Sequence, residues 1–167
     1  MRKPKDNVSR MGHDFEERVK DVLAKNNYVL VEKNKWTPNY APENDYATKR
    51  EFDLVMYNNL EKQFYVVECK AHISEEKMVE YEQVRKFDYV SRHYGASRAK
   101  KMIVTDTGLS SRAMEYCQRN FIRVIDGKRL REMERRPGTP YLPAVSSLVR
   151  YGLEKIVKGL ILNYKKS

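Results

Sequence analysis

Two acidic residues and a lysine stand at the ends of two neighbouring apolar segments. Asp53 lies near the start of residues 52–57, and Glu68 and Lys70 close residues 64–70. Aromatic and β-branched residues dominate both segments, which predicts two strands, and the polar residues between them predict a hairpin turn. The hairpin would bring Asp53 close to Glu68 and Lys70, which predicts a site for a metal ion and a water. The alternative is a simple ion pair between Glu68 and Lys70, because charged groups are costly to bury without a partner.

A third acid lies on the helix that residues 12–27 predict. The apolar residues of this segment recur at helical spacing, at Phe15, Val19, Val22 and Leu23. Glu16 stands three residues before Val19 and therefore leans toward the buried face. An acid that points inward predicts a functional role for Glu16, and the alternative is a half-exposed position at the edge of the helix.

The elements that must position these residues alternate between strands and helices. After the first helix they are a strand at residues 28–32, the hairpin, a helix at residues 75–94 capped by Ser74, a strand at residues 102–105, a helix capped by Ser110 or Ser111, a strand at residues 121–125 and a helix at residues 128–135. This order predicts an α/β fold in which a central mixed β-sheet is flanked by helices on both faces.

Gln83 is the polar member of the inward-facing stripe on the helix predicted at residues 75–94. The other members of that stripe are Val79, Phe87, Val90 and Tyr94. An amide in this place is either a buried group with its hydrogen-bond partners or a second-layer residue that supports the site.

The sequence predicts three parts. Residues 1–11 form a short basic arm, residues 12–136 form the α/β domain, and residues 137–167 form a proline-rich linker and a basic amphipathic helix. The apolar stripe of this C-terminal helix predicts docking on its own domain or pairing with a second copy, which would make a homodimer. Contact with DNA is a further alternative.

The formal net charge of +10 over 167 residues predicts an acidic partner, for which DNA is the candidate, although charge also serves solubility. Phosphate contacts are expected from the basic patch of Arg92, Arg98, Lys100 and Lys101, and from Lys49 and Arg50. The last two stand among aromatic residues that could stack on unpaired bases or could equally pack back onto the sheet. A membrane surface is a poorer match, because the C-terminal segment lacks the usual aromatic anchors.

Cysteine usage and hydropathy indicate the compartment. Cys69 and Cys117 lack the spacing of a metal site and are too few for a disulfide framework, which fits a reducing environment. No apolar segment follows the basic N-terminus, and no stretch approaches the roughly 20 apolar residues that cross a bilayer. We therefore expect a soluble, cytoplasmic protein with no membrane partner and no small-molecule cofactor.

These residues together resemble a nuclease superfamily. The segment Gly12-His13-Asp14-Phe15-Glu16, then Asp53, then Glu68-Cys69-Lys70 resembles the PD-(D/E)XK superfamily, which has the restriction-endonuclease-like fold. Residues 103–108, Ala113 and residues 122–130 (IRVIDGKRL) are similar to Mrr-type restriction endonucleases, and the first helix and the hairpin are similar, less closely, to archaeal Holliday junction resolvases. The resemblance covers roughly residues 12–133. Phe52 replaces the proline of the superfamily pattern, and Glu68 stands where Mrr-like proteins often have glutamine.

The resemblance implies a metal-dependent DNA endonuclease that hydrolyses phosphodiester bonds. It implies that Asp53, Glu68 and the backbone carbonyl of Cys69 bind Mg²⁺, for which Mn²⁺ is expected to substitute. It also implies that Lys70 orients or helps to deprotonate the attacking water, and that Glu16 binds a second ion or a metal-bound water.

Two alternatives to a general endonuclease remain open. A non-catalytic nucleic-acid-binding or assembly subunit could keep the same fold, although the intact set of Asp53, Glu68 and Lys70 favours catalysis. A Holliday junction resolvase would be a narrower form of the nuclease, and it would require a dimer with two sites facing one DNA. No helix is predicted to read base edges, so the sequence predicts no sequence preference.

Overall fold

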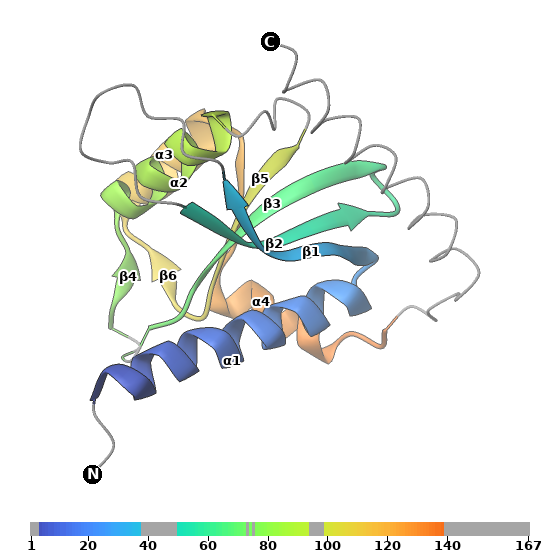
Figure 1. The fold of residues 1–167 in the computed structure, drawn as a ribbon, viewed down its shortest axis with the longest axis horizontal. Helices are drawn as coiled ribbons and strands as arrows, with labels where there is room; N and C mark the ends of the chain where they lie inside the picture. The colour runs from blue at the N-terminus through green and yellow to red at the C-terminus, as the bar shows by residue number, and fades with distance from the viewer. Residues whose placement is uncertain (1–3, 38–49, 73, 75, 94–98, 139–167) are drawn as a thin grey trace.

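The computed structural model describes residues 4–37, 50–72, 74, 76–93 and 99–138, which form four helices and two β-sheets (Figure 1). In chain order the elements are α1 (Pro4–Lys25), β1 (Tyr28–Thr37), β2 (Arg50–Asn58), β3 (Gln63–Lys70), β4 (Met78–Val79), α2 (Tyr81–His93), β5 (Lys100–Thr105), β6 (Gly108–Leu109), α3 (Ser111–Arg119), β7 (Ile122–Ile125) and α4 (Gly127–Arg135).

The larger sheet has five strands in the order β1-β2-β3-β5-β7. β1, β2 and β3 are antiparallel neighbours, whereas β3, β5 and β7 run parallel and are joined by crossovers that contain α2 and α3. The smaller sheet pairs β4 with β6. The predicted α/β fold with a central mixed sheet is confirmed, and so is the hairpin formed by β2 and β3.

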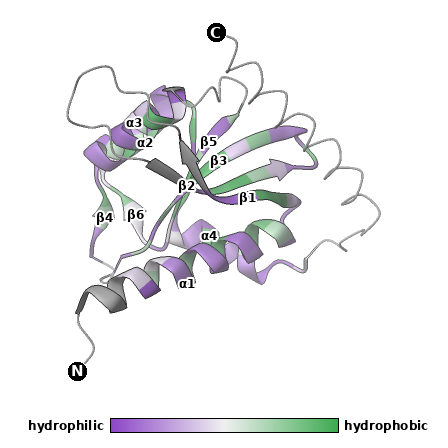
Figure 2. Ribbon diagram, viewed as in Figure 1, coloured by the Kyte–Doolittle hydropathy of each residue, from purple (hydrophilic) through white to green (hydrophobic). Residues whose placement is uncertain are grey.

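Apolar side chains fill both faces of the larger sheet. On one face, α1 and α4 contribute Leu23 and Leu130 to a cluster that we call the α1/α4 core. On the other face, α2 and α3 contribute Phe87 and Ala113 to the α2/α3 core. Figure 2 shows hydrophobic residues along the strands and alternating hydrophobic and hydrophilic residues along the helices, as expected when each helix buries one side against the sheet.

The first helix and the first strand are both longer than the sequence predicts. α1 begins at Pro4, where the fixed φ of proline suits a first helical turn. Residues 4–11, predicted as a separate basic arm, are therefore continuous with the helix. β1 continues to Thr37 because β2 pairs with it as far as the pair Thr37↔Arg50.

The helix predicted at residues 75–94 begins later than expected, because β4 interrupts it and α2 starts at Tyr81. Ser74 therefore does not cap this helix. The backbone N–H of Glu80 donates to the side-chain oxygen of Gln83 at 2.8 Å, and the N–H of Gln83 donates to the Glu80 carbonyl at 3.0 Å. This is a capping arrangement at the helix start. Gln83 is exposed, so the predicted role as a buried amide is wrong, and its role as support for the site stays a prediction.

The structure does not describe the predicted C-terminal helix. Residues 139–167 lie outside the described residues, and with them lies the contact through which a homodimer is predicted. In the part of the chain that is described, no helix has the length and apolar character needed to cross a membrane.

Candidate active site

The ladder between β2 and β3 ends at Leu54, one residue after Asp53. Asp53 Oδ2 accepts a hydrogen bond from the backbone N–H of Cys69 at 2.6 Å. Phe52 and Leu54 pack into opposite cores although only one residue separates them, so the regular alternation of side chains along β2 is interrupted at Asp53. The Asp53 carboxyl group is thereby held against the end of β3.

Burial and the negative charge of Glu68 raise the pKa of Asp53 to about 7. The charge of Glu16 raises it further, while the hydrogen bond from Cys69 and the charge of Lys70 oppose the shift. Acidic groups that repel one another in a partly buried place favour uptake of a proton or of a cation. The sequence prediction that Asp53 and Glu68 lie close together agrees with this geometry.

Glu68 and Lys70 form an ion pair at the end of β3. Their Oε1 and Nζ atoms are 2.5 Å apart, and both side chains are largely buried. Burial lowers the pKa of Lys70, but the charge and hydrogen bond of Glu68 outweigh this and hold the pKa above its ordinary value. The simple ion pair allowed by the sequence is therefore present, within a larger charged group that includes Asp53.

Glu16 approaches the strands from α1, as the helical spacing predicts. Its side chain is 20% exposed, and its Oε2 lies 3.7 Å from Lys33 Nζ and 4.0 Å from His13 Nδ1. The sequence assigns no role to Lys33, because this residue lies beyond the predicted end of the first strand. The ladder between β1 and β2 brings Lys33 opposite Leu54, next to Asp53.

The donors at this site suit a hard divalent cation. The Cys69 thiol packs against the α1/α4 core, and burial raises its pKa well above the ordinary value, so its backbone is the part able to serve as a ligand. Among the described residues, no group of three or more His, Cys, Asp or Glu side chains is arranged to hold a metal. Two carboxylates and one carbonyl leave positions for water, which Mg²⁺ retains in most sites.

A polar cluster that the sequence does not predict lies where β3 and β5 end. The backbone N–H of His72 donates to the two carboxylate oxygens of Asp106 at 3.1 and 3.2 Å, and His72 Nδ1 lies 3.1 Å from Thr107 Oγ1. Thr105 is fully buried and is the ladder partner of Lys70. These contacts fix the chain that leaves β3 just after Lys70.

Three of the basic residues predicted to bind nucleic acid, Arg92, Lys100 and Lys101, lie away from the end of β3 that carries Lys70. Lys100 pairs with Tyr65 where β5 begins, whereas Lys70 lies at the end of β3. Arg92 and Lys101 both contact the buried Asp88, at 2.7 and 2.5 Å.

The structure does not describe the side chains of the three other members of that prediction. Lys49 and Arg98 lie outside the described residues, and the side chain of Arg50 is not described although its backbone begins β2. Their role, like that of the rest of the basic patch, stays a prediction.

The sequence matches one family model. This is the Mrr catalytic-domain family, described as restriction endonuclease, and the match covers residues 8–134. It includes Glu16, Asp53, Glu68 and Lys70 and extends into α4. No curated protein matches the sequence significantly.

Several solved structures are similar. AF1548, a protein of unknown function, is 18% identical, with 83% of this chain and 78% of that chain covered and a TM-score of 0.56, which is a likeness of fold. Can2 from Sulfobacillus thermosulfidooxidans, in complex with cyclic tetra-adenylate, is 27% identical over 74% of this chain and 36% of its own, with a TM-score of 0.49. The restriction endonuclease MspJI, in complex with a 27-mer oligonucleotide, is 20% identical over 89% of this chain and 32% of its own, with a TM-score of 0.46. This chain therefore spans about a third of the length of the last two.

Proposed function

The chain belongs to the restriction endonuclease family of the Mrr catalytic-domain model, and on this basis we propose that it is a metal-dependent endonuclease that hydrolyses phosphodiester bonds in DNA. The observation that carries the proposal is the pair of acidic groups, Asp53 and Glu68, beside the ammonium of Lys70. A pKa of about 7 for Asp53 is expected of a site that a cation completes.

The residues that would hold the cation are Asp53, Glu68 and the backbone carbonyl of Cys69. We propose Mg²⁺ as the cation, with Mn²⁺ as a substitute, because these oxygen donors match the preference of hard ions. When bound, such an ion supplies a nucleophilic water and stabilises the charge that develops on the phosphate.

Lys70 and Glu16 support this chemistry in different ways. The pKa of Lys70 is raised, so its side chain is an ammonium at neutral pH, which favours orienting the attacking water and offsetting phosphate charge over removing a proton. Glu16 adds a carboxylate from α1, close enough to raise the pKa of Asp53, and would bind a second ion or a metal-bound water.

DNA is the proposed substrate because the chain carries a net charge of +10 and the family is one of restriction endonucleases. A non-catalytic DNA-binding subunit is the second candidate, since such a protein could keep this fold. A dimeric Holliday junction resolvase is a narrower form of the first proposal, and it depends on residues that lie outside the described part of the chain.

Cleavage assays test the proposal. Plasmid, single-stranded and four-way-junction DNA are incubated with Mg²⁺, Mn²⁺ or EDTA and with the wild-type, Glu68→Gln and Glu132→Gln proteins. Glu132 is an exposed acid on α4 and serves as the matched control. We expect metal-dependent cleavage that Glu68→Gln lowers by about a hundredfold or more, since a bound ion contributes several kcal/mol to transition-state stabilisation.

Other outcomes separate the candidates. Cleavage that persists in EDTA, or that survives in Glu68→Gln, contradicts the proposed site. Salt-sensitive binding without cleavage by the wild-type protein favours the non-catalytic subunit. Preference for the four-way junction, together with a dimeric mass in gel filtration, favours the resolvase.

A further inference from the structure

Phe121 occupies a backbone position and an environment that do not suit phenylalanine. It follows Asn120, the residue that caps the C-terminus of α3, and has a φ of 54°, which is the left-handed conformation that glycine favours after a helix. Its side chain is 89% exposed, the largest exposed fraction among the large apolar side chains that stand out on the described surface. Neither the backbone nor the core of the protein gains from an aromatic ring at this position.

An open cleft lies beside Phe121, where β5 and β7 begin. Its volume is about 340 Å³, and Phe121, Gln118, Lys100, Lys101 and Arg123 are among the residues that line it. Three of its lining residues are cations and none of the described lining residues is acidic. The cleft therefore combines an exposed ring, a basic rim and an amide.

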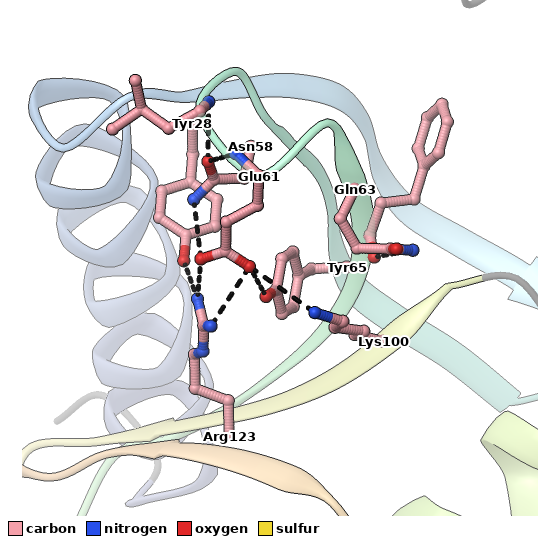
Figure 3. A network of polar contacts seen from close by, with 9 residues as sticks. Tyr28, Asn58, Glu61, Gln63, Tyr65, Lys100 and Arg123 are labelled. Carbon is pink, nitrogen blue, oxygen red and sulfur yellow. Dashed lines mark hydrogen bonds and ion pairs between the residues drawn. The ribbon is translucent and has the colours of Figure 1, made fainter.

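The cations differ in how firmly they are held by neighbouring acids. Glu61 accepts hydrogen bonds from Arg123 with both carboxylate oxygens, at 2.7 and 3.2 Å, while its Oε2 lies 3.7 Å from Lys100 Nζ. Figure 3 shows these residues gathered around the Glu61 carboxylate. The Arg123 guanidinium also donates to the hydroxyl of Tyr28 at 2.7 Å and lies over the ring of Tyr65. Arg123 is thus held by several partners, whereas the Lys100 side chain is 54% exposed and can exchange its long contact for a phosphate.

We propose that this cleft binds single-stranded DNA, with an unpaired base stacked on Phe121 and the adjoining phosphate near Lys100. A flat, exposed aromatic side chain beside cations is the combination that binds single strands without reading their sequence, because every base has a π-face. The strain at Phe121 is then the cost of placing a ring where a base can reach it.

The cleft is separate from the candidate active site. Lys100 pairs with Tyr65, five residues along β3 from Lys70, and five residues of a strand span about 16 Å. A strand held on Phe121 therefore leaves Asp53 and Glu68 free. The inference rests on the proposed function in taking DNA as the ligand, and it adds that the preferred substrate has an unpaired segment.

Binding of a fluorescein-labelled oligothymidylate in EDTA, where metal-dependent cleavage does not occur, tests the proposal. We expect Phe121→Leu to weaken binding on the order of tenfold, because stacking contributes about 1–3 kcal/mol per base. Phe121→Trp, in a Trp36→Phe background, should bind at least as well as wild type, and its fluorescence should be quenched by the stacked base. Leu60→Ala, which alters a side chain that is 73% exposed on the hairpin turn, is the matched control and should bind normally.

A second variant separates loss of binding from loss of folding. Phe121→Gly suits the positive φ, so it should raise the Tm by about 2–4 °C and still weaken oligothymidylate binding as Phe121→Leu does. Normal oligothymidylate binding by Phe121→Leu and Phe121→Gly overturns the inference. So does a change of oligomeric state in gel filtration without a change in binding, which would identify Phe121 as a contact between copies of the chain.

The inference and the proposed function fail in different ways. Metal-dependent cleavage of duplex plasmid should persist in Phe121→Leu, and binding of oligothymidylate should persist in Glu68→Gln. If Glu68→Gln abolishes cleavage of the plasmid and the Phe121 variants bind oligothymidylate normally, the nuclease proposal holds and the single-strand site is contradicted.

Discussion

At the scale of single residues, the carboxyl group of Asp53 connects the stability of the fold to the proposed chemistry. Its pKa is raised from 3.8 to about 7 by burial and by Glu68. Between these two values the unfolded chain releases a proton that the folded protein keeps, so stability falls as the pH rises through this range. Above about pH 7 the full cost of burying the charged carboxylate is present.

Replacing this carboxyl group should therefore stabilise the metal-free protein at high pH. In EDTA at pH 8, we expect Asp53→Asn to raise the free energy of unfolding by about 1–3 kcal/mol, and the gain should vanish toward pH 4. The amide oxygen can still accept the hydrogen bond from Cys69. Urea unfolding followed by circular dichroism measures the difference, and a gain that is the same at both pH values contradicts the pKa argument.

In the presence of a metal ion, the wild-type protein should become more stable than Asp53→Asn. A bound cation removes the repulsion between Asp53 and Glu68, so Mg²⁺ or Mn²⁺ should raise the Tm of the wild-type protein, and more at pH 8 than at pH 6. Asp53→Asn lacks one ligand and should show little metal effect. Addition of EDTA should return the wild-type Tm to its metal-free value, and an equal metal effect in both proteins counts against Asp53 as a ligand.

The positions of the two acids and the lysine of the candidate site could be predicted from the sequence, whereas their surroundings could not. Asp53, Glu68 and Lys70 stand at strand ends, where the pattern of apolar residues predicts both the strands and the hairpin. The ion pairs of Lys101 and Arg92 could not be predicted, because they depend on the burial of Asp88 between elements distant in sequence. Contacts between side chains that are distant in sequence give no periodic pattern in the sequence.

At the scale of elements, Asp88 ties α2 to β5 and to α3. Its side chain is 1% exposed and contacts Lys101, Arg92 and the Tyr116 hydroxyl. Burial raises its pKa, but the hydrogen bonds from these three residues outweigh burial and lower it below the ordinary value. The stabilisation is therefore present at neutral pH and is lost as the pH falls through the lowered pKa.

Removing the charge of Asp88 should leave its cationic partners, Lys101 and Arg92, without the carboxylate that they contact. At pH 7, we expect Asp88→Asn to lower the free energy of unfolding by about 3–5 kcal/mol, because a buried ion pair loses one member. Glu115→Gln, which breaks the exposed pair with Arg119, should cost less than about 1 kcal/mol. Chemical denaturation of the two variants gives the comparison, and equal effects would mean that the buried contacts add nothing.

Two glycines should respond in opposite ways to the same substitution. A Cβ atom at Gly127 would lie 1.9 Å from the Asp106 carbonyl oxygen, while the Gly127 N–H donates to the Thr107 carbonyl at 2.7 Å. Gly127→Ala should therefore lower the Tm markedly or prevent folding. Gly12 lies in α1, and outside the local helix backbone no atom lies within 4 Å of its would-be Cβ, so Gly12→Ala should add about 0.5–1 kcal/mol of stability. Differential scanning calorimetry tests both.

The elements were predicted where their periodicity is strong and local. The hairpin, β5, α3, β7 and α4 follow from such patterns, with their ends close to those predicted. β4 and β6 could not be predicted, because each has two residues and depends on pairing across a sequence separation that contains α2 and β5. The predicted start of α2 is wrong for the same reason, because Val79, which has the spacing of a helical residue, belongs to β4.

At the scale of the whole molecule, the residues behind the net charge of +10 differ in how accessible they are to a partner. Lys101 is 19% exposed and bound to Asp88, whereas Lys100 is 54% exposed with one contact at 3.7 Å. Neighbours in sequence can therefore differ in function. One contributes to stability, and the other is free to exchange its partner for a phosphate.

The salt dependence of DNA binding tests this division of roles. For roughly four phosphate contacts, raising the salt from about 50 to 200 mM should weaken binding on the order of a hundredfold, because each contact releases counterions. Lys100→Gln should reduce the slope of log K against log salt by about 1 and leave unfolding unchanged. Lys101→Gln should leave the slope nearly unchanged and lower the free energy of unfolding, since Asp88 loses its closest cation.

Fluorescence anisotropy measures the slope, and urea titration of the same samples measures the free energy of unfolding. An equal effect of the two variants on the slope would mean that the ion pair with Asp88 does not withhold Lys101 from DNA.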